Sequence, residues 1–275
     1  MYSRVYIEIT NICNMSCSFC HGHSRRHGFM TEEDFSEILR KLEGQTKYIY
    51  YHLMGEPLLH EKLTVFLNKA AEKGFHSVIT TNGTLLKEKG DALISSGVYK
   101  VNISLHSQEQ KGPAAREEYL RQVISFADKA SKAGIIVVMR LWNKGFDEGR
   151  NDGILELLRG SLCGEWTENT RGIRIRDKLH LEWGDRFEWP DKDAPIENEE
   201  VFCYGLRDHF GILCDGSVVP CCLDSEGELT LGNIFTEDIN DILGCPSAES
   251  MREGFEKRKA VKNLCRRCGY AQRFV

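Results

Sequence analysis

Apolar and polar residues alternate in a regular way over roughly the first 180 residues of the chain. Val5, Ile7 and Ile9 alternate with polar residues, which predicts a first β-strand that begins near residue 4. The run at 135–141 is almost entirely apolar, which is typical of a parallel strand buried on both faces. Further strand-like runs begin near residues 47, 76, 98, 135 and 172.

The segments between these strands have apolar residues at helical spacing. The first such segment follows a capping pattern at Thr31-Glu32-Glu33-Asp34. The predicted helices cover residues 35–42, 63–71, 85–96, 116–133 and 153–159. Strands that alternate with helices predict an α/β fold with a parallel sheet, and six units predict an open partial (β/α)6 TIM-like barrel. We expect this barrel to occupy residues 1–180.

Residues that could bind a ligand or take part in catalysis follow the C-terminal ends of the predicted strands. In parallel α/β folds, ligands collect at this edge of the sheet. The residues in question are the cysteine loop that begins at Cys13, Gly55-Glu56-Pro57, Asn82-Gly83, Ser104 with His106, and Arg140. Their shared position predicts one site at the mouth of the barrel.

The cysteine loop contains Cys13, Cys17 and Cys20, separated by three and then two residues. Three thiols in one loop can hold a metal centre and leave one coordination position open, which is typical of catalytic metal sites. A zinc site completed by His21 or His23 is one alternative. A c-type haem site is another, because Cys17-x2-Cys20-His21 matches that attachment pattern, but it requires an exported chain.

The pattern changes from Asp177 onwards. Trp183, Phe187 and Trp189 indicate a linker or lid at residues 181–202, and a hairpin with an Asp215-Gly216 turn follows. This C-terminal part, residues 203–275, contains a second group of cysteines: Cys203, Cys214, Cys221, Cys222, Cys245, Cys265 and Cys268.

Composition excludes several classes of protein. The 275 residues include 36 Lys and Arg against 41 Asp and Glu, a formal net charge of −5, which does not favour nucleic acid or an anionic membrane. We find no export signal and no apolar run of about 18 residues, so we expect a cytoplasmic protein. Eleven cysteines in a reducing compartment point to metal binding rather than to disulfides.

The cysteine loop resembles the signature of the radical S-adenosylmethionine (SAM) superfamily, including the aromatic Phe19 before the last cysteine. This resemblance implies that Cys13, Cys17 and Cys20 hold a [4Fe–4S] cluster whose open iron binds SAM. It also implies reductive cleavage of SAM to a 5′-deoxyadenosyl radical that abstracts a hydrogen atom from the substrate.

The same resemblance implies further cofactor-binding residues. Gly55-Glu56-Pro57 is similar to the segment that binds the methionine amino group, with Met54 in place of its first glycine. Ser104 and Arg140 correspond to contacts with the ribose and the carboxylate, and Asn82 is expected at the same edge. Arg171 resembles an active-site arginine that anchors a substrate anion or helps to remove a proton, although a surface arginine at a strand start fits equally well.

The C-terminal part resembles the SPASM/twitch type of auxiliary-cluster domain. The resemblance is to single-cluster members such as the aminocyclitol dehydrogenase of butirosin biosynthesis. It implies one auxiliary [4Fe–4S] cluster, with a structural zinc ribbon as the alternative. Cys222 could replace Cys221, and Cys214, Cys163 and Cys245 are interpreted as core residues. The expected ligands are Cys203, Cys221, Cys265 and Cys268.

These observations predict an enzyme that performs a net oxidation, either dehydrogenation or bond formation, with electron transfer to the auxiliary cluster. Four thiolates would leave no open iron on that cluster, which favours an electron-transfer role. We expect a small-molecule or peptide substrate and a reductant such as flavodoxin or ferredoxin, with nucleic acid and membrane disfavoured. A peptide-modifying maturase and a zinc-binding module without redox chemistry are the alternatives.

Overall fold

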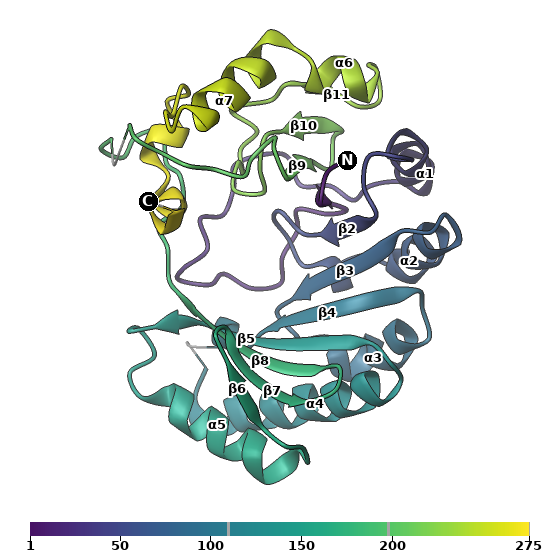
Figure 1. Ribbon diagram of the computed structural model, residues 1–275. Helices are drawn as coiled ribbons and strands as arrows, with labels where there is room; N and C mark the ends of the chain where they lie inside the picture. The colour runs from purple at the N-terminus through teal and green to yellow at the C-terminus, as the bar shows by residue number, and fades with distance from the viewer. Residues whose placement is uncertain (109–110, 197–198, 275) are drawn as a thin grey trace.

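The computed structural model describes residues 1–108, 111–196 and 199–274, and its strands form one open, curved sheet (Figure 1). The described strands follow the order β11-β10-β9-β1-β2-β3-β4-β5-β8-β7-β6. Six neighbouring parallel strands form the barrel wall: β1 (Arg4–Ile7), β2 (Tyr48–Tyr51), β3 (His76–Thr81), β4 (Val98–Ser104), β5 (Ile136–Lys144) and β8 (Leu179–Asp185). The sheet does not close, so the open partial barrel predicted from the sequence is confirmed.

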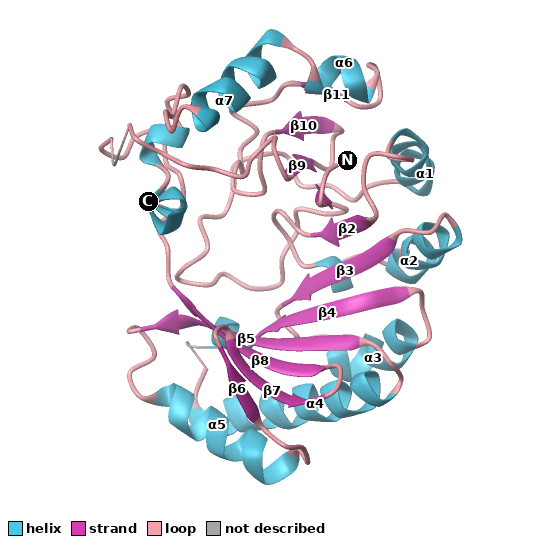
Figure 2. Cartoon of the chain, in the orientation of Figure 1, coloured by secondary structure: helices cyan, strands magenta, loops and turns pink. Residues whose placement is uncertain are grey.

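Helices cover the convex face of this sheet (Figure 2). Thr31 caps the first of them, because its side chain accepts a hydrogen bond from the amide of Asp34. Phe35 and Phe66, from two neighbouring helices, stack with ring centroids 4.3 Å apart in the core between helices and sheet. The helices are α1 (Glu32–Lys41), α2 (Leu63–Glu72), α3 (Leu86–Ile94), α4 (Pro113–Lys132) and α5 (Arg150–Ser161).

The sixth parallel strand is not the one expected from the sequence. Residues 172–175 do form a strand, β7 (Gly172–Arg176), but it pairs antiparallel with β8 and with β6 (Thr167–Asn169). β8 takes the parallel place beside β5, because the hairpin turn at Lys178, with φ +61°, reverses the chain. The expected boundary at residue 180 therefore falls inside β8, and Trp183 belongs to this strand rather than to a lid.

The C-terminal part continues the same sheet. β9 (His209–Ile212) pairs parallel with β1, and β10 (Ser217–Val219) and β11 (Gly232–Asn233) follow antiparallel. Gly216, with φ +84°, provides the left-handed turn of the predicted hairpin. Short helices complete this part: α6 (Ile239–Leu243), α7 (Pro246–Glu256) and the 3-10 turns Cys265–Arg267 and Gly269–Phe274.

Two further 3-10 turns, Pro57–Leu59 and Leu105–Gln108, follow the second and fourth strands at the barrel mouth. Within the described residues, no helix has the length and apolar character needed to cross a membrane.

Candidate active site

One cavity of about 490 Å³ lies at the C-terminal edge of the sheet, and both cysteine groups line it. Cys13, Cys17 and Cys20 lie on its barrel side, and Cys203, Cys221 and Cys268 lie on the side of the C-terminal part. The other predicted site residues that line it are Phe19, Gly55, Glu56, Asn82, Ser104 and Arg140. Segments far apart in the sequence therefore line one cavity.

Asn82, at the end of β3, supports the cysteine loop. Its side-chain amide lies 3.9 Å from the Cys13 sulfur and donates to the Asn14 side chain at 2.9 Å. Asn14 in turn donates to the hydroxyl of Thr84 at 2.9 Å. The β3 end therefore fixes where the first thiol lies.

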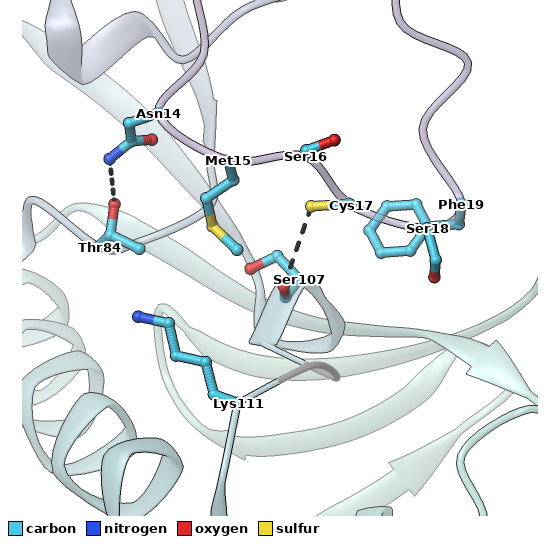
Figure 3. A pocket seen from close by; sticks show the side chains of 9 residues that line it. All are labelled: Asn14, Met15, Ser16, Cys17, Ser18, Phe19, Thr84, Ser107 and Lys111. Atoms are coloured by element: carbon cyan, nitrogen blue, oxygen red, sulfur yellow. Dashed lines mark hydrogen bonds between the residues drawn. The ribbon is translucent and has the colours of Figure 1, made fainter.

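On the other side of the same loop, Cys17 lies beside Ser107 and a second hollow of about 320 Å³ (Figure 3).

Gly55 allows the second strand end to press against the cysteine loop. Its φ is +79°, and a Cβ placed on it would lie 2.3 Å from the carbonyl oxygen of Thr10. The Glu56 amide then donates to the carbonyl of Ile12 at 2.8 Å, one residue before Cys13. Only glycine combines this backbone conformation with this close approach.

Glu56 joins the ends of β2 and β3. Its buried carboxylate accepts hydrogen bonds from the Thr81 hydroxyl at 2.7 Å, the Asn82 amide at 2.7 Å and the Leu58 amide at 3.0 Å. Burial raises the pKa of the Glu56 carboxyl, although these hydrogen bonds act in the opposite direction. Pro57 does not line the cavity; it is buried at the start of the 3-10 turn.

Ser104 and Arg140 occupy paired positions on β4 and β5, so their side chains lie on the same face of the sheet. Arg140 lies 3.7 Å from the carboxylate of Glu182 and 4.6 Å from the ring centroid of Trp142. Burial lowers the pKa of Arg140, and the charge of Glu182 opposes this effect. A guanidinium held in this way can receive a carboxylate at the cavity wall.

His106 packs under the cysteine loop, with its ring centroid 4.7 Å from that of Phe19. Its Nδ1 lies 3.1 Å from the carbonyl of Arg140 and 3.3 Å from the amide of Trp142. Burial lowers the pKa of His106 to about 4, so the ring is neutral at physiological pH.

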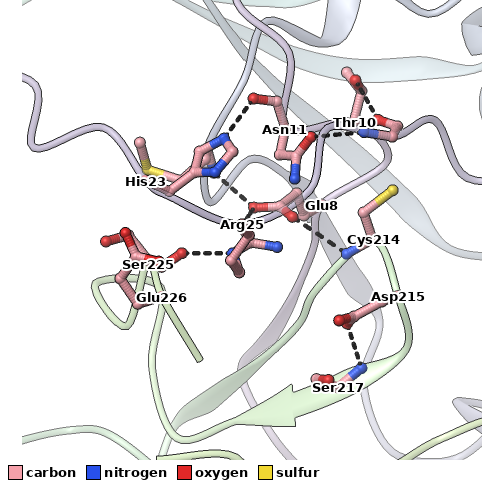
Figure 4. Close-up of polar contacts among 12 residues, drawn as sticks. Glu8, Thr10, Asn11, His23, Arg25, Cys214, Asp215, Ser217, Ser225 and Glu226 are labelled. Carbon is pink, nitrogen blue, oxygen red and sulfur yellow. Dashed lines mark hydrogen bonds and ion pairs between the residues drawn. The ribbon is translucent and has the colours of Figure 1, made fainter. Parts of the chain in front are cut away.

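A buried ion pair connects the first strand to the C-terminal part (Figure 4). The Arg25 guanidinium lies 2.7 Å from Glu8 and donates to the carbonyl of Ser225 at 2.7 Å. Glu8 also accepts from the amides of Met54 and Cys214, both at 3.2 Å. The Glu8 carboxylate thus holds together the segment that follows the cysteine loop, the end of β2 and the hairpin formed by β9 and β10.

The segment after β8 passes over the cysteine loop. The indole N–H of Trp189 donates to the carbonyl of Phe19 at 3.0 Å, and Arg186 donates to the carbonyl of Ser18 at 3.5 Å. Phe187 packs against both Trp189 and Tyr270, at centroid distances of 5.6 Å and 4.9 Å. These three aromatic side chains line the cavity at the junction of the two parts.

Four cysteines of the C-terminal part surround one small apolar void of about 40 Å³. Burial, followed by repulsion from neighbouring thiols, raises the pKa of Cys221 and of Cys265. Burial raises the pKa of Cys268 to about 11. A bound metal centre would offset the repulsion among thiolates gathered in this way. The four are Cys203, Cys221, Cys265 and Cys268.

The remaining cysteines lie elsewhere. Cys222 lines the large cavity rather than the small void, beside Tyr6. Cys214 and Cys245 are half-buried and pack against the core, as expected. Cys163 was expected in the core, but it is exposed, because it follows the last turn of α5 at the surface.

Arg171 lies apart from the other predicted residues. It is exposed in the turn between β6 and β7 and does not line the cavity. Among the cavity residues that were not singled out from the sequence, four lie on one wall, and the alternation along the first strand signals two of these four. The four are Arg4, Tyr6, His52 and His209.

A zinc ion is the single-metal alternative for these cysteines. Zinc requires ligands that converge to about 2.3 Å from one centre. Among the described residues, no three His, Cys, Asp or Glu side chains converge to hold one metal ion.

Comparisons with known proteins agree with this geometry. Residues 7–146 match the radical SAM superfamily, and residues 203–269 match SPASM, an iron–sulfur cluster-binding domain. The chain belongs to the radical SAM superfamily, and it is a radical SAM enzyme with an auxiliary-cluster domain. A [4Fe–4S] cluster, SAM and an auxiliary iron–sulfur site follow from membership, which favours iron over the zinc alternatives.

The chain is similar to curated proteins named GTP 3′,8-cyclase or probable GTP 3′,8-cyclase. The chain is 31% identical to the enzyme of Nautilia profundicola over 283 residues, covering 91% of this chain and 85% of the relative. It is 30% identical to the probable enzyme of Methanothermobacter marburgensis over 178 residues, covering 57% of this chain and 58% of the relative. In several such relatives the match spans only half to three-fifths of their length.

The fold is also similar to a solved structure. The crystal structure of BtrN in complex with AdoMet and 2-DOIA has a TM-score of 0.61 and 19% sequence identity, covering 98% of this chain and 93% of BtrN. At this level of identity the similarity establishes the fold alone.

Proposed function

We propose that the chain oxidises a small molecule held in the 490 Å³ cavity, by abstraction of a hydrogen atom from it. The shared cavity carries this proposal, because thiols of both cysteine groups line it and a substrate there is adjacent to each. When bound, SAM and its [4Fe–4S] cluster supply a 5′-deoxyadenosyl radical as the hydrogen-abstracting agent. A reductant such as flavodoxin or ferredoxin is needed to supply one electron.

In this proposal Cys13, Cys17 and Cys20 hold the SAM-binding cluster. The strand ends around them hold SAM: Glu56 orients the Thr81-Asn82 backbone, and Gly55 sets the distance between this segment and the cysteine loop. Ser104 and Arg140 face the ribose and the carboxylate from β4 and β5. Each residue acts by position and hydrogen bonding, which is how a protein directs a reactive cofactor.

The C-terminal thiols account for the oxidation. Cys203, Cys221, Cys265 and Cys268 would complete the coordination of one auxiliary [4Fe–4S] cluster, which confines it to electron transfer. A substrate that loses a hydrogen atom and then one electron and a proton is oxidised by two electrons overall. Dehydrogenation and bond formation both meet this balance. Arg171 has no role here, because its exposed side chain lies outside the cavity lining.

Mutations that remove ligands from one cysteine group at a time test this proposal. Under anaerobic conditions with SAM and dithionite, C13A should abolish 5′-deoxyadenosine formation, and the double variant C265A/C268A should retain it. For any compound that raises this activity, the double variant should lose the oxidised product. C163S removes an exposed thiol and serves as the control. Equal product formation by wild type and the double variant would refute the oxidation.

GTP 3′,8-cyclisation is a second candidate, supported by the names of the curated relatives. It predicts that GTP stimulates 5′-deoxyadenosine formation and is itself consumed. If GTP has neither effect on the wild-type enzyme, this candidate is excluded and the oxidation of another small molecule is retained. A peptide substrate remains the other alternative for the same assay.

A further inference from the structure

Four residues form a polar patch inside the cavity, which we call the Arg4 subsite: Arg4, Tyr6, His52 and His209. Arg4 and His209 are paired neighbours on β1 and β9 and therefore share a face of the sheet. The Tyr6 ring lies 5.0 Å from the His52 ring and 5.4 Å from the His209 ring. The four side chains thus form one wall of the cavity.

Three nitrogen atoms of this subsite lack hydrogen-bond partners within the part of the chain that the structure describes, although Arg4 also bonds to Tyr50 and Tyr6 to Cys222. Arg4 Nε, His52 Nδ1 and His209 Nδ1 are all buried without a hydrogen bond. Buried polar atoms in proteins are almost always paired, so three orphans in one cavity indicate that a ligand completes them.

Arg4 also differs from two other partly buried arginines, Arg25 and Arg140, which each lie beside a carboxylate. Arg25 pairs with Glu8 at 2.7 Å, and Arg140 lies 3.7 Å from Glu182. Burial acts to lower the pKa of Arg4, but Tyr6, Tyr50 and Cys222 outweigh burial and raise the pKa overall, and no carboxylate is among these groups. A partly buried charge of this kind is stable when a counter-charge comes from elsewhere.

The two histidines add hydrogen-bonding atoms without adding charge. Burial, followed by the charges of Arg140 and Arg4, lowers the pKa of His52 to about 3. Burial and Arg4 lower the pKa of His209 to about 4. At physiological pH both rings are neutral, and the subsite presents one guanidinium flanked by two imidazoles. This combination suits a single oxyanion rather than an extended polyanion.

We propose that the substrate carries an oxyanion, a carboxylate or a phosphate group, which binds at the Arg4 subsite. The inference rests on the proposed function, since it names the class of substrate that the same cavity takes. Arg4 lies near Cys222, which adjoins the auxiliary ligand Cys221. The anion therefore anchors the substrate at the auxiliary end of the cavity and directs its other end toward the cysteine loop.

Binding of simple anions to the cluster-loaded enzyme with SAM tests the proposal by isothermal titration calorimetry. Inorganic phosphate and acetate are the probes, and the one that saturates the site identifies the phosphate or carboxylate class. R4Q should weaken binding about ten- to a hundredfold, the effect of losing charge-assisted hydrogen bonds. R4K should retain part of the affinity. R207Q, which changes an exposed arginine outside the cavity, should leave it unchanged.

Three results would overturn the inference: unchanged anion affinity in R4Q, equal weakening by R207Q, or no saturable binding of either anion by the wild-type enzyme. If R4Q shifts the reduction potential of the auxiliary cluster but still binds the anion, Arg4 balances the charge of that cluster and does not bind substrate. If R4Q does not fold, H209N replaces it and should weaken binding severalfold. Formation of 5′-deoxyadenosine, measured on the same samples, tests the proposed function separately.

Discussion

Glu8 and Arg25 form an ion pair of 2.7 Å in which the side chains are 0% and 13% exposed. Glu8 is the residue that follows β1, and its second oxygen accepts from Cys214 in the C-terminal part. This pair therefore sets the position of the cysteine loop relative to the second cysteine group. In the proposed function, electron transfer and substrate placement would both depend on that relationship.

Replacement of Glu8 by Gln should destabilise the protein by about 3 kcal/mol, because the largely buried charge of Arg25 loses the carboxylate that neutralises it. Urea denaturation under anaerobic conditions measures the change. E117Q, which removes an exposed pair on α4, is the matched control and should have little effect. Similar stabilities for E8Q and E117Q would contradict the structural role of the pair.

Replacement of Gly55 by Ala should greatly weaken SAM binding. The new Cβ would lie 2.3 Å from the Thr10 carbonyl oxygen, so the segment that carries Glu56 must move away from the cysteine loop. G134A is the control, since Gly134 also has a positive φ but nothing within 4 Å of a Cβ. It should cost about 1 kcal/mol of stability and leave SAM binding intact. Equal SAM affinities for the two variants would refute the prediction.

Much of the fold could be predicted from local patterns. The alternation around Val5 and Ile7 located the first strand, and the apolar run at 135–141 located the fifth. The sixth parallel strand was missed because β8 alternates buried Leu179 and Leu181 with half-buried polar residues. That pattern does not distinguish a barrel strand from an edge hairpin. β8 becomes a barrel strand because it pairs with β5, and this long-range contact cannot be seen in the local sequence.

The site was predictable only where spacing carries chemistry. Cys13, Cys17 and Cys20 stand out because three thiols in one loop have few other uses. Arg4 and His209 lie about two hundred residues apart, and each is unremarkable in its own segment. Only the parallel pairing of β1 with β9 brings them together, so no local signal could have identified the subsite.

The pH dependence of stability should report the neutral state of His52. Its pKa is lowered to about 3 in the folded chain, from about 6.5 when unfolded. The stability gained from the neutral ring is therefore complete above the unfolded pKa and is lost as the pH falls toward the folded pKa. From pH 8 to pH 6, H52N should lose about 1 kcal/mol less stability than wild type. Identical losses, measured by urea denaturation, would contradict burial of a neutral ring.

Replacement of Trp189 by Phe should loosen the cover of the cysteine loop. The variant keeps an aromatic ring but loses the hydrogen bond to the Phe19 carbonyl. Loss of iron to a chelator should become about fivefold faster, as expected for the loss of one hydrogen bond. W166F, which loses a similar bond to Leu162 away from the cavity, should match wild type. Equal rates for W189F and W166F would show that the segment does not protect the loop.

The central claim is that two separate cysteine groups hold two iron–sulfur clusters around one cavity. It is tested most directly by the iron content of the anaerobically reconstituted chain, compared between wild type, C13A/C17A/C20A and C265A/C268A. The account predicts about eight irons per wild-type chain and about four in each variant, with 5′-deoxyadenosine formed only when the first group is intact. About four irons in the wild type, or zinc in place of iron at either group, would contradict it.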